Sequence, residues 1–335
     1  MVNDPKAKPS MKKVMPAALV GAVLMLLSGP AAWAMAVGDD GSHGQGGSLV
    51  AGGSPSISSK AAARRQVART RRTRTGLDEP ALRSSAALVV DESTSSVLFS
   101  KHADVVTPIA SITKLMTALV VLEANQPLNQ TLEITADDQR LGKPSVSRLT
   151  VGTELSRGDL LHLALMSSEN RAANALGRNY PGGLAACVAA MNAKARALGM
   201  TTAHFVEPTG LSSDNVASPE DLSKLVIAAS QNTAIQTYST DSRYMVPVGR
   251  RMLEFRNTDS LVSNPSWNIV VQKTGYIAEA GKCLVMKAII EGRAVVIVLL
   301  DSVGKQSRVA DARRIKKWME AHLSAETPRL AARRV

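Results

Sequence analysis

Residues 108–114 read Pro108-Ile-Ala-Ser-Ile-Thr-Lys114, and this stretch decides how the rest of the chain is interpreted. It opens a helical apolar pattern with a serine and a lysine in its first turn. Two shorter motifs follow in order, Ser168-Glu-Asn170 and Lys273-Thr-Gly275. Each motif is weak alone, because such short patterns arise by chance in chains of this length. Together they supply a nucleophile, a base, a proton relay and a carboxylate clamp, which are the parts that an acyl-transfer site needs.

Ser111 is the candidate nucleophile, at the start of a helix predicted to run to about Ala124. Apolar residues recur at i, i+3, i+4, i+7 and i+8 along it, and further aliphatic residues predict burial nearly all round. A serine here also fits a plain helix N-cap. Lys114 favours catalysis, because it lies one turn on, beside Ser111, in an otherwise apolar helix. Burial would make this lysine lose its proton more easily and act as the general base.

Ser168 and Asn170 fall at a predicted corner between two helices. A corner can present both side chains to a cleft. There the Ser168 hydroxyl would relay a proton to the leaving amine, and the Asn170 amide would hold the lysine or a substrate carbonyl. The alternative is a pair of N-cap residues that opens the second helix. Glu169 is expected to point away and is given no role.

Lys273 is predicted to lie at the end of a strand, as an exposed cation that faces the site. It would attract a substrate carboxylate and disfavour the charged form of the catalytic lysine. Thr274 would hydrogen-bond the same carboxylate, and Gly275 would allow another backbone to approach closely. The backbone N–H groups of Ser111 and Tyr276 would form an oxyanion hole.

Strands are predicted near both ends of the folded region, with helices between them. An early hairpin covers residues 87–101, and later strands cover 269–273, 282–290 and 294–301, followed by a helix over 307–323. The middle carries helices over residues 156–166, 169–179, 184–198 and 218–230. This order predicts a mixed α/β (α+β) fold, in which both chain ends build one antiparallel sheet and the helices form an inserted lobe.

Over about residues 85–323, the chain resembles the low-molecular-mass penicillin-binding proteins of the serine D-Ala-D-Ala carboxypeptidase family. Within that family it resembles the D-alanyl-D-alanine endopeptidase, or penicillin-binding protein 7, type. The three motifs carry the resemblance together with Phe205-Val-Glu-Pro-Thr-Gly-Leu211, Phe255-Arg-Asn-Thr258, Trp267-Asn-Ile and Cys283-Leu-Val-Met286. The resemblance implies a β-lactamase/DD-peptidase-like fold. It also implies that Ser111 is the acyl-ester nucleophile and Lys114 its proton acceptor, that Ser168 and Asn170 form the second motif, and that Lys273 binds substrate.

The function implied by the resemblance is that of a periplasmic serine DD-peptidase that acts on peptidoglycan stems and cross-links, needs no cofactor and is inhibited by β-lactams. Cleavage of cross-links is favoured over carboxypeptidase trimming of pentapeptides. The reason is that only about a dozen residues follow the last helix, without the amphipathic anchor that many carboxypeptidases of the family carry. A serine β-lactamase is a weaker alternative, since residues 171–230 lack the E-x-x-L-N stretch that class A enzymes use in deacylation. The intact motifs argue against a non-catalytic wall-binding protein.

Residues 1–36 are predicted to be a secretory signal peptide, with lysines before a short apolar run at 17–27 and small residues after it. Because that run is short for a spanning helix, cleavage is favoured over an uncleaved anchor, and either alternative leads to the periplasm. Residues 37–84 are predicted to be a linker, rich in Gly and Ser and then in Arg. It is either a basic tether that contacts acidic wall polymer or anionic lipid, or a solvated linker without a partner. Residues 324–335 are predicted to be a basic tail.

The formal net charge of +12 lies mostly in these end segments, so the folded part is nearly neutral. The Arg-rich stretch has no interleaved aromatic residues, which argues against nucleic-acid binding. The five histidines are scattered without ligand spacing, and no metal site is predicted. Cys187 and Cys283 could pair in an exported protein, but both have apolar neighbours, and two separately buried thiols are favoured.

Overall fold

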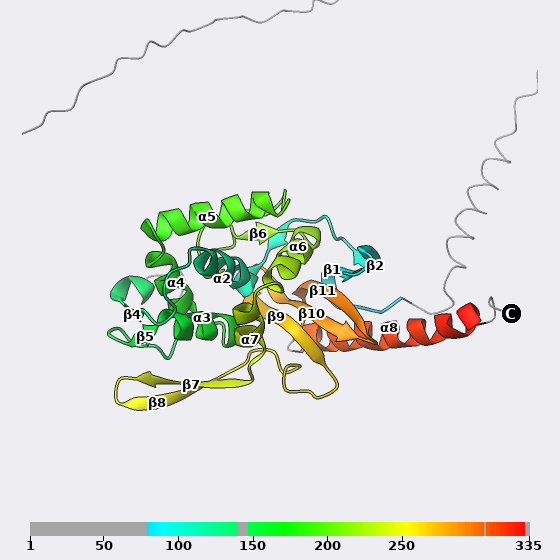
Figure 1. The fold of residues 1–335 in the computed structure, drawn as a ribbon. Coiled ribbons are helices and arrows are strands. Elements are labelled where there is room, and N and C mark those ends of the chain that lie inside the picture. The colour runs from blue at the N-terminus through cyan, green and yellow to red at the C-terminus, as the bar shows by residue number, and fades with distance from the viewer. Residues whose placement is uncertain (1–78, 140–146, 305, 332–335) are drawn as a thin grey trace, which may run out of the picture. The chain divides into compact units, whose positions relative to one another are not determined.

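The computed structural model describes residues 79–139, 147–304 and 306–331, and it places both ends of this region in one five-stranded sheet (Figure 1). The strands lie in the order β2-β1-β11-β10-β9, and every neighbouring pair is antiparallel. The predicted antiparallel sheet, built from both chain ends, is therefore confirmed. The strand bounds are Ser84–Asp91 (β1), Ser96–Lys101 (β2), Asn268–Ile277 (β9), Gly281–Ile290 (β10) and Arg293–Ser302 (β11).

Both faces of this sheet are covered, because alternate side chains of its central strands enter two different hydrophobic cores. Val285 lies in the core that also contains residues of helix α6 (Pro219–Ala229). Its neighbour Leu284 lies in the second core, with residues of helix α8 (Ser307–Ala331). Strands buried on both faces need continuous apolar runs rather than alternation, and this is the pattern that β10 and β11 carry.

The inserted lobe is helical, and helix α2 (Thr113–Glu123) runs through it with almost every side chain buried, as predicted. Two predicted helix starts are confirmed as well, whereas α2 begins at Thr113 rather than at Ser111. Ser156 and Asp159 form a capping box at the start of α3, and Ser218 caps α6. The other helices of the lobe are α3 (Arg157–Met166), α4 (Asn170–Arg178), α5 (Gly183–Ala197) and α7 (Thr233–Thr240).

Several short elements were not predicted from the sequence. They are β3 (Thr107–Pro108) paired with β6 (Val216–Ala217), β4 (Thr131–Glu133) paired with β5 (Glu154–Ser156), β7 (Arg243–Val248) paired with β8 (Arg251–Arg256), and the 3-10 turns η1 (Ala110–Ile112) and η2 (Ala136–Gln139). Two of them bear on the site. The η1 turn contains Ser111, and β8 leads the chain directly to Thr258.

The ends of the described region only partly test the predicted boundaries. Helix α8 continues to Ala331, past its predicted end near Leu323. The predicted signal peptide, residues 1–36, and nearly all of the predicted linker, residues 37–84, lie outside the described residues. Within the described ranges, none of the helices combines the length and the apolarity needed to cross a membrane.

Cys187, in α5, and Cys283, in β10, are both buried and unpaired. Burial raises the pKa of the Cys187 thiol to about 12 and that of Cys283 to about 11, so both thiols stay protonated at neutral pH. The prediction of two separately buried thiols is confirmed.

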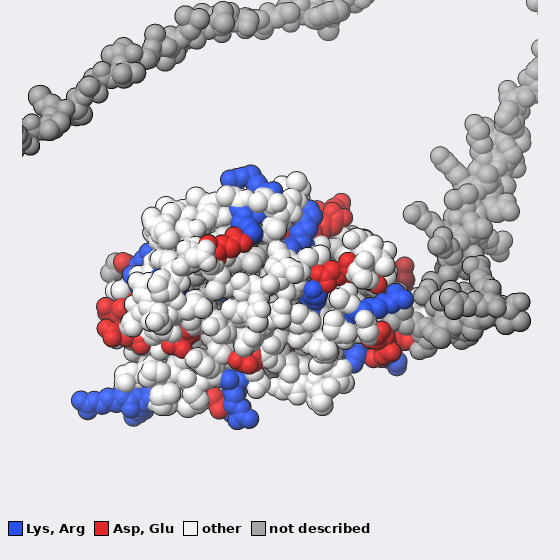
Figure 2. Space-filling view, viewed as in Figure 1, with Lys and Arg blue, Asp and Glu red and all other residues white. Residues whose placement is uncertain are grey.

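Charged residues of both signs are interspersed on the face shown in Figure 2, mostly toward its rim, and uncharged residues cover much of the middle. The described residues of this face therefore present mixed charge rather than a continuous basic surface, in keeping with the nearly neutral composition of the folded part.

Candidate active site

Ser111 lies in η1, the tight turn that leads directly into α2. The preceding Ala110 has a positive φ of 48°, which a residue with a side chain adopts only under constraint. Helix α2 takes Ile112 as its N-cap without any side-chain hydrogen bond, so Ser111 does not serve as a plain helix cap. Its Oγ instead accepts a hydrogen bond from Lys114 Nζ at 2.8 Å.

The amine of Lys114 is buried and is held by acceptors from three separate segments of the chain. Nζ donates to Ser111 Oγ at 2.8 Å, to Asn170 Oδ1 at 2.7 Å and to the Thr209 carbonyl oxygen at 2.6 Å. Burial lowers the pKa of Lys114 to about 8, although two nearby carboxylates oppose this shift. A neutral amine is therefore accessible close to physiological pH.

These three bonds suit a general base. A protonated lysine has three N–H donors, one for each acceptor. After it loses one proton, the two remaining donors can stay on the Asn170 amide oxygen and the Thr209 carbonyl oxygen, neither of which carries a proton. The lone pair is then left facing Ser111 Oγ, the one partner that has a proton to give. The geometry thus aims the basic nitrogen at the predicted nucleophile.

The corner between α3 and α4 brings the second motif to the same place. Ser168 has a positive φ of 61°, which turns the chain sharply between the two helices. Asn170 is the first residue of α4, and its side chain reaches Lys114. The cap of α4 is Glu169, whose carboxylate accepts from the Arg171 backbone N–H at 3.3 Å. Ser168 and Asn170 are therefore not the cap pair. The expectation that Glu169 has no role is wrong, because it caps α4 and is buried.

Two expectations for Lys273 are also wrong. It lies inside β9 rather than at a strand end, because β9 continues to Ile277 in register with β10. It is fully buried rather than exposed, and its Nζ donates to the Thr274 carbonyl oxygen at 2.9 Å. Burial, reinforced by the charge of Lys114, holds the pKa of Lys273 well below its usual value. Burial therefore disfavours the charged form of this lysine, and the nearby Asp259 carboxylate only partly offsets that effect.

Thr258 joins the second and third motifs. Its Oγ1 lies 2.5 Å from Thr274 Oγ1, and its backbone N–H donates to the Met166 carbonyl oxygen at 3.1 Å. Met166 is the last residue of α3, immediately before the corner. Thr274 is buried, whereas Tyr276, two residues further along β9, is exposed. Thr258 therefore fixes the position of the Thr274 hydroxyl relative to the corner.

Two glycines let other backbones approach the nucleophile. A Cβ on Gly275 would lie 3.2 Å from the Ser111 nitrogen and 3.1 Å from the Ala110 Cβ, which confirms the predicted close approach. A Cβ on Gly210, whose φ is +81°, would lie only 1.9 Å from the Ala110 carbonyl oxygen. Gly210 follows Thr209 directly, so the loop that carries the third acceptor of the lysine lies against η1.

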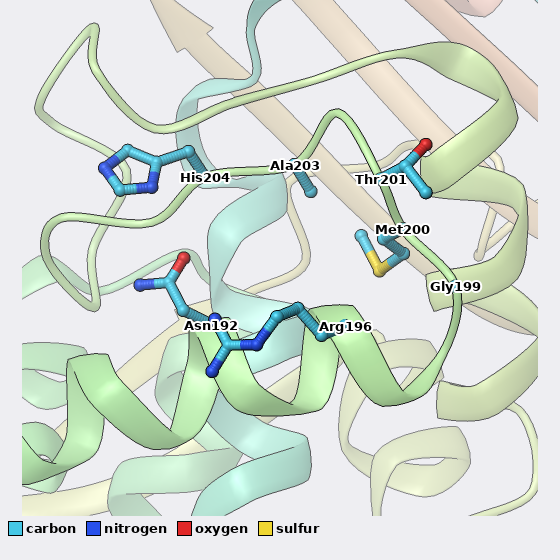
Figure 3. Close-up of a pocket in the computed structure, with 7 residues that line it drawn as sticks. All are labelled: Asn192, Arg196, Gly199, Met200, Thr201, Ala203 and His204. Atoms are coloured by element: carbon cyan, nitrogen blue, oxygen red, sulfur yellow. The ribbon is translucent and has the colours of Figure 1, made fainter. Parts of the chain in front are cut away.

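Two of the hollows on the described part of the molecule are lined by residues of the helical lobe. One, of about 360 Å³, adjoins the second motif and is lined by Ser167, Glu169, Arg148 and the end of β8. The other, of about 480 Å³, lies between α5 and the loop after it and contains none of the motif residues (Figure 3). Neither is a metal site, since no group of three His, Cys, Asp or Glu side chains in the described ranges is placed to hold an ion. The larger hollow is lined by Asn192, Arg196, Gly199, Met200, Thr201, Ala203 and His204.

Comparison with known proteins places this geometry in a family. A family model described as D-alanyl-D-alanine carboxypeptidase matches residues 73–304. The chain belongs to the D-alanyl-D-alanine carboxypeptidase family. The D-alanyl-D-alanine endopeptidase of Pseudomonas aeruginosa is 48% identical over 241 residues, which cover 71% of this chain and 78% of that protein. The D-alanyl-D-alanine endopeptidase of Escherichia coli is 46% identical over 248 residues, covering 73% and 80%. The crystal structure of the Streptomyces K15 DD-transpeptidase matches with a TM-score of 0.68 at 28% identity, covering 73% of this chain and 100% of that one.

As a member of the D-alanyl-D-alanine carboxypeptidase family, the chain is a serine-type hydrolase of D-alanyl peptides. The predicted family and enzyme class are therefore confirmed, and so is the similarity to the endopeptidase type. The fold is the DD-peptidase fold that the resemblance implied.

The loop formed by residues 207–215 is one part of the site that was not predicted from the sequence. The stretch Phe205–Leu211 supported the resemblance, but no role was derived for it. Its contribution is the Thr209 carbonyl oxygen, a backbone atom that no pattern of side chains reveals. The one local signal is the Pro208-Thr-Gly210 sequence, which is typical of a turn.

Proposed function

We propose that this protein is a periplasmic D-alanyl-D-alanine endopeptidase that hydrolyses peptidoglycan cross-links through an acyl-enzyme on Ser111. The observation that carries the proposal is the placement of Lys114, a buried amine of lowered pKa held 2.8 Å from Ser111 Oγ. The two relatives named D-alanyl-D-alanine endopeptidase, at 48% and 46% identity, favour cross-link cleavage over carboxypeptidase activity.

In the first half-reaction, Ser111 Oγ attacks the carbonyl carbon of the D-alanyl residue while neutral Lys114 takes the hydroxyl proton. The new C–O bond makes the acyl-enzyme, and the C–N bond to the next residue breaks. The departing amine needs a proton, which Ser168 relays from the lysine. Asn170 keeps the lysine aligned through its amide oxygen. Water then attacks the ester, Lys114 takes a proton from it, and Ser111 is released.

The oxyanion of each tetrahedral intermediate would be bound by the backbone N–H groups of Ser111 and Tyr276. Gly275 supports this assignment, because the absence of a side chain lets β9 approach the Ser111 nitrogen. Removal of one such donor typically slows a reaction by about 10²–10³-fold. The pair would therefore be a major part of the rate enhancement.

Lys273 and Thr274 would bind the substrate carboxylate. Because Lys273 is buried beside another lysine, its pKa is lowered, and a bound carboxylate would raise that pKa again by supplying the opposite charge. A lysine charged in this way disfavours the protonated form of Lys114. Capture of a carboxylate would thus favour the reactive state of the base.

The chain ends complete the proposal. Residues 1–36 would direct export to the periplasm and be removed. Residues 37–84 would then form an N-terminal linker that leads into the catalytic domain at 85–323. Residues 324–335 would form a basic tail. The arginines of the linker would contact acidic wall polymer or anionic lipid. β-Lactams would inhibit by acylating Ser111, and the mechanism requires no cofactor.

Digestion of purified muropeptides tests this function. We expect the protein to convert cross-linked dimers to monomers, and the Ser111→Ala variant to leave the dimers intact. Pentapeptide monomers in a parallel digest measure the alternative activity. If pentapeptides lose their terminal D-alanine while dimers persist, the protein is a carboxypeptidase. If a folded wild-type protein cuts neither substrate, the proposed function is wrong.

A further inference from the structure

We propose that Glu207 is a positioning residue of the acylation site, whose carboxylate fixes the 207–215 loop so that the Thr209 carbonyl oxygen holds Lys114 against Ser111. This inference rests on the acylation of Ser111 proposed above. It assigns a structural role to a carboxylate that takes no part in the catalytic steps described above.

The carboxylate of Glu207 accepts an unusual number of hydrogen bonds from its own loop. Oε2 accepts from the backbone N–H and from the hydroxyl of Thr209, both at 2.6 Å. Oε1 accepts from the Gly210 N–H at 2.6 Å, from Asn215 Nδ2 at 2.9 Å and from the Ser212 N–H at 3.4 Å. All five partners are donors, so the site requires an ionised carboxylate, which is acceptor-only. A glutamine would present an NH₂ group to some of these donors.

The loop held in this way forms hydrogen bonds to residues on both sides of Ser111. Its Asn215 amide donates to Thr113 Oγ1 at 3.1 Å, and the Asn215 carbonyl oxygen accepts from the Ile109 N–H at 3.0 Å. Thr113 Oγ1 in turn donates to the Ala110 carbonyl oxygen at 2.8 Å. The carboxylate is therefore connected to the residues before and after the nucleophile through one residue, Asn215, whose side-chain amide and backbone carbonyl oxygen make the two contacts.

The same loop sets the position of the base. The Thr209 carbonyl oxygen accepts from Lys114 Nζ at 2.6 Å and lies 3.5 Å from Ser111 Oγ. Two of the five bonds to Glu207 come from Thr209, so a shift of the loop would move this acceptor. A displacement of about 1 Å can slow a reaction by about 10²-fold.

Glu207 also acts on Lys114 through its charge. The charged groups that face this lysine are Glu207 from the loop, Glu169 from the α3–α4 corner and Lys273 from β9. The two carboxylates raise the pKa of Lys114 and Lys273 opposes them, and the larger effect of the two carboxylates is that of Glu207. Neutralising Glu207 should therefore lower the pKa of the base as well as loosen its support.

These two effects can be separated by acylation kinetics. We would measure the second-order rate of acylation by benzylpenicillin against pH in the full-length protein, and confirm folding by circular dichroism and thermal melting. For Glu207→Gln, we expect the plateau rate to fall by about 10- to 100-fold, because the loop loses its central acceptor. In the plot of acylation rate against pH, we also expect the acid limb, where the rate rises as Lys114 loses its proton, to move to lower pH. The reason is that the charge that raised the pKa of Lys114 is gone.

Two further variants complete the test. Glu207→Asp keeps the charge but shortens the side chain, so we expect a reduced plateau with the acid limb near its wild-type position. This variant tests the geometry even if Glu207→Gln does not fold. Glu220→Gln also removes one negative charge, from an exposed side chain in the first turn of α6. Its plateau rate and the position of its acid limb should both match those of wild type.

Wild-type plateau rates in folded Glu207→Gln or Glu207→Asp would overturn the positioning role. A pH–rate profile that does not move in Glu207→Gln would overturn the effect of the Glu207 charge on Lys114. Failure of the proposed function has a different signature, because benzylpenicillin would then acylate Ser111→Ala or fail to acylate wild type.

Discussion

The carbonyl oxygen of Thr209 lies 2.6 Å from Lys114 Nζ, closer than either of the other two acceptors of that amine. A loop far along the chain thus completes a site that a single short helical motif begins. Because the acceptor is a backbone atom, no substitution of the Thr209 side chain removes it. Its position depends instead on how closely the loop can lie against η1, and Gly210 is the residue that allows this contact.

Gly210→Ala should therefore abolish acylation and destabilise the fold. A Cβ there would lie 1.9 Å from the Ala110 carbonyl oxygen, so the loop must move. Gly152→Ala is the matched control, since Gly152 has the same φ of +81° but nothing within 4 Å of the added carbon. We expect the control to lose only about 1–2 kcal/mol of unfolding free energy, which is the cost of a left-handed backbone conformation for alanine, and to keep its acylation rate. Equal losses of unfolding free energy in the two variants, measured by urea denaturation, would contradict the steric account.

The lowered pKa of Lys114 predicts how stability depends on pH. This pKa is about 8 in the folded protein and 10.5 in the unfolded chain, so the unfolded chain binds more protons between these values. The unfavourable contribution of Lys114 is therefore fully present below pH 8 and is relieved as the pH rises to about 10.5, by about 3 kcal/mol. The free energy of unfolding of wild type relative to Lys114→Met should rise by that amount across this range. A flat difference would mean that the lysine is not desolvated.

Much of the fold could be predicted because it depends on short sequence patterns, such as helix periodicity and cap residues, and on the order of strands and helices along the chain. The apolar stripe of α2 and the cap residues Ser156 and Ser218 are readable at single positions, and strands at both chain ends can share a sheet in only a few ways. The hairpin of β7 and β8 was missed although Gly249 marks its turn, because Pro247 interrupts the first run and a proline usually argues against a strand.

The site was predicted less completely, for physical reasons. Ser111, Lys114 and Asn170 form the contact that their motifs predict. The burial of Lys273 was not predictable, because it depends on β9 continuing past Gly275 and on the elements that cover the strand. The contributions of Thr209 and Thr258 depend on contacts between distant segments, which leave no periodic signal in the sequence.

Lys273→Ala should weaken capture of carboxylate-bearing β-lactams and peptides. Burial disfavours the charged form of this lysine, and a bound carboxylate favours it, so the variant loses the positive charge that would hold the carboxylate. An esterified substrate has no carboxylate to capture, and we expect it to narrow the difference in kcat/KM between variant and wild type. If esterification lowers kcat/KM by the same factor in both proteins, Lys273 is not the partner of the carboxylate.

Thr258→Val should raise KM more than it lowers kcat. The substitution keeps the shape of the side chain but removes the hydroxyl that lies 2.5 Å from Thr274 Oγ1, so the Thr274 hydroxyl loses its fixed orientation. Loss of one hydrogen bond of about 1 kcal/mol corresponds to roughly a fivefold rise in KM. Thr258→Ser retains the hydroxyl and should resemble wild type in steady-state assays. A fall in kcat alone would place Thr258 in the chemical step rather than in binding.

The most direct test of the central claim is intact-mass and peptide-mapping analysis after incubation with benzylpenicillin. We expect one covalent adduct on wild type, mapped to the peptide that contains Ser111, and no adduct on folded Ser111→Ala. An adduct that persists on Ser111→Ala, or one that maps to Ser168 in wild type, would contradict the assignment of Ser111 as the nucleophile.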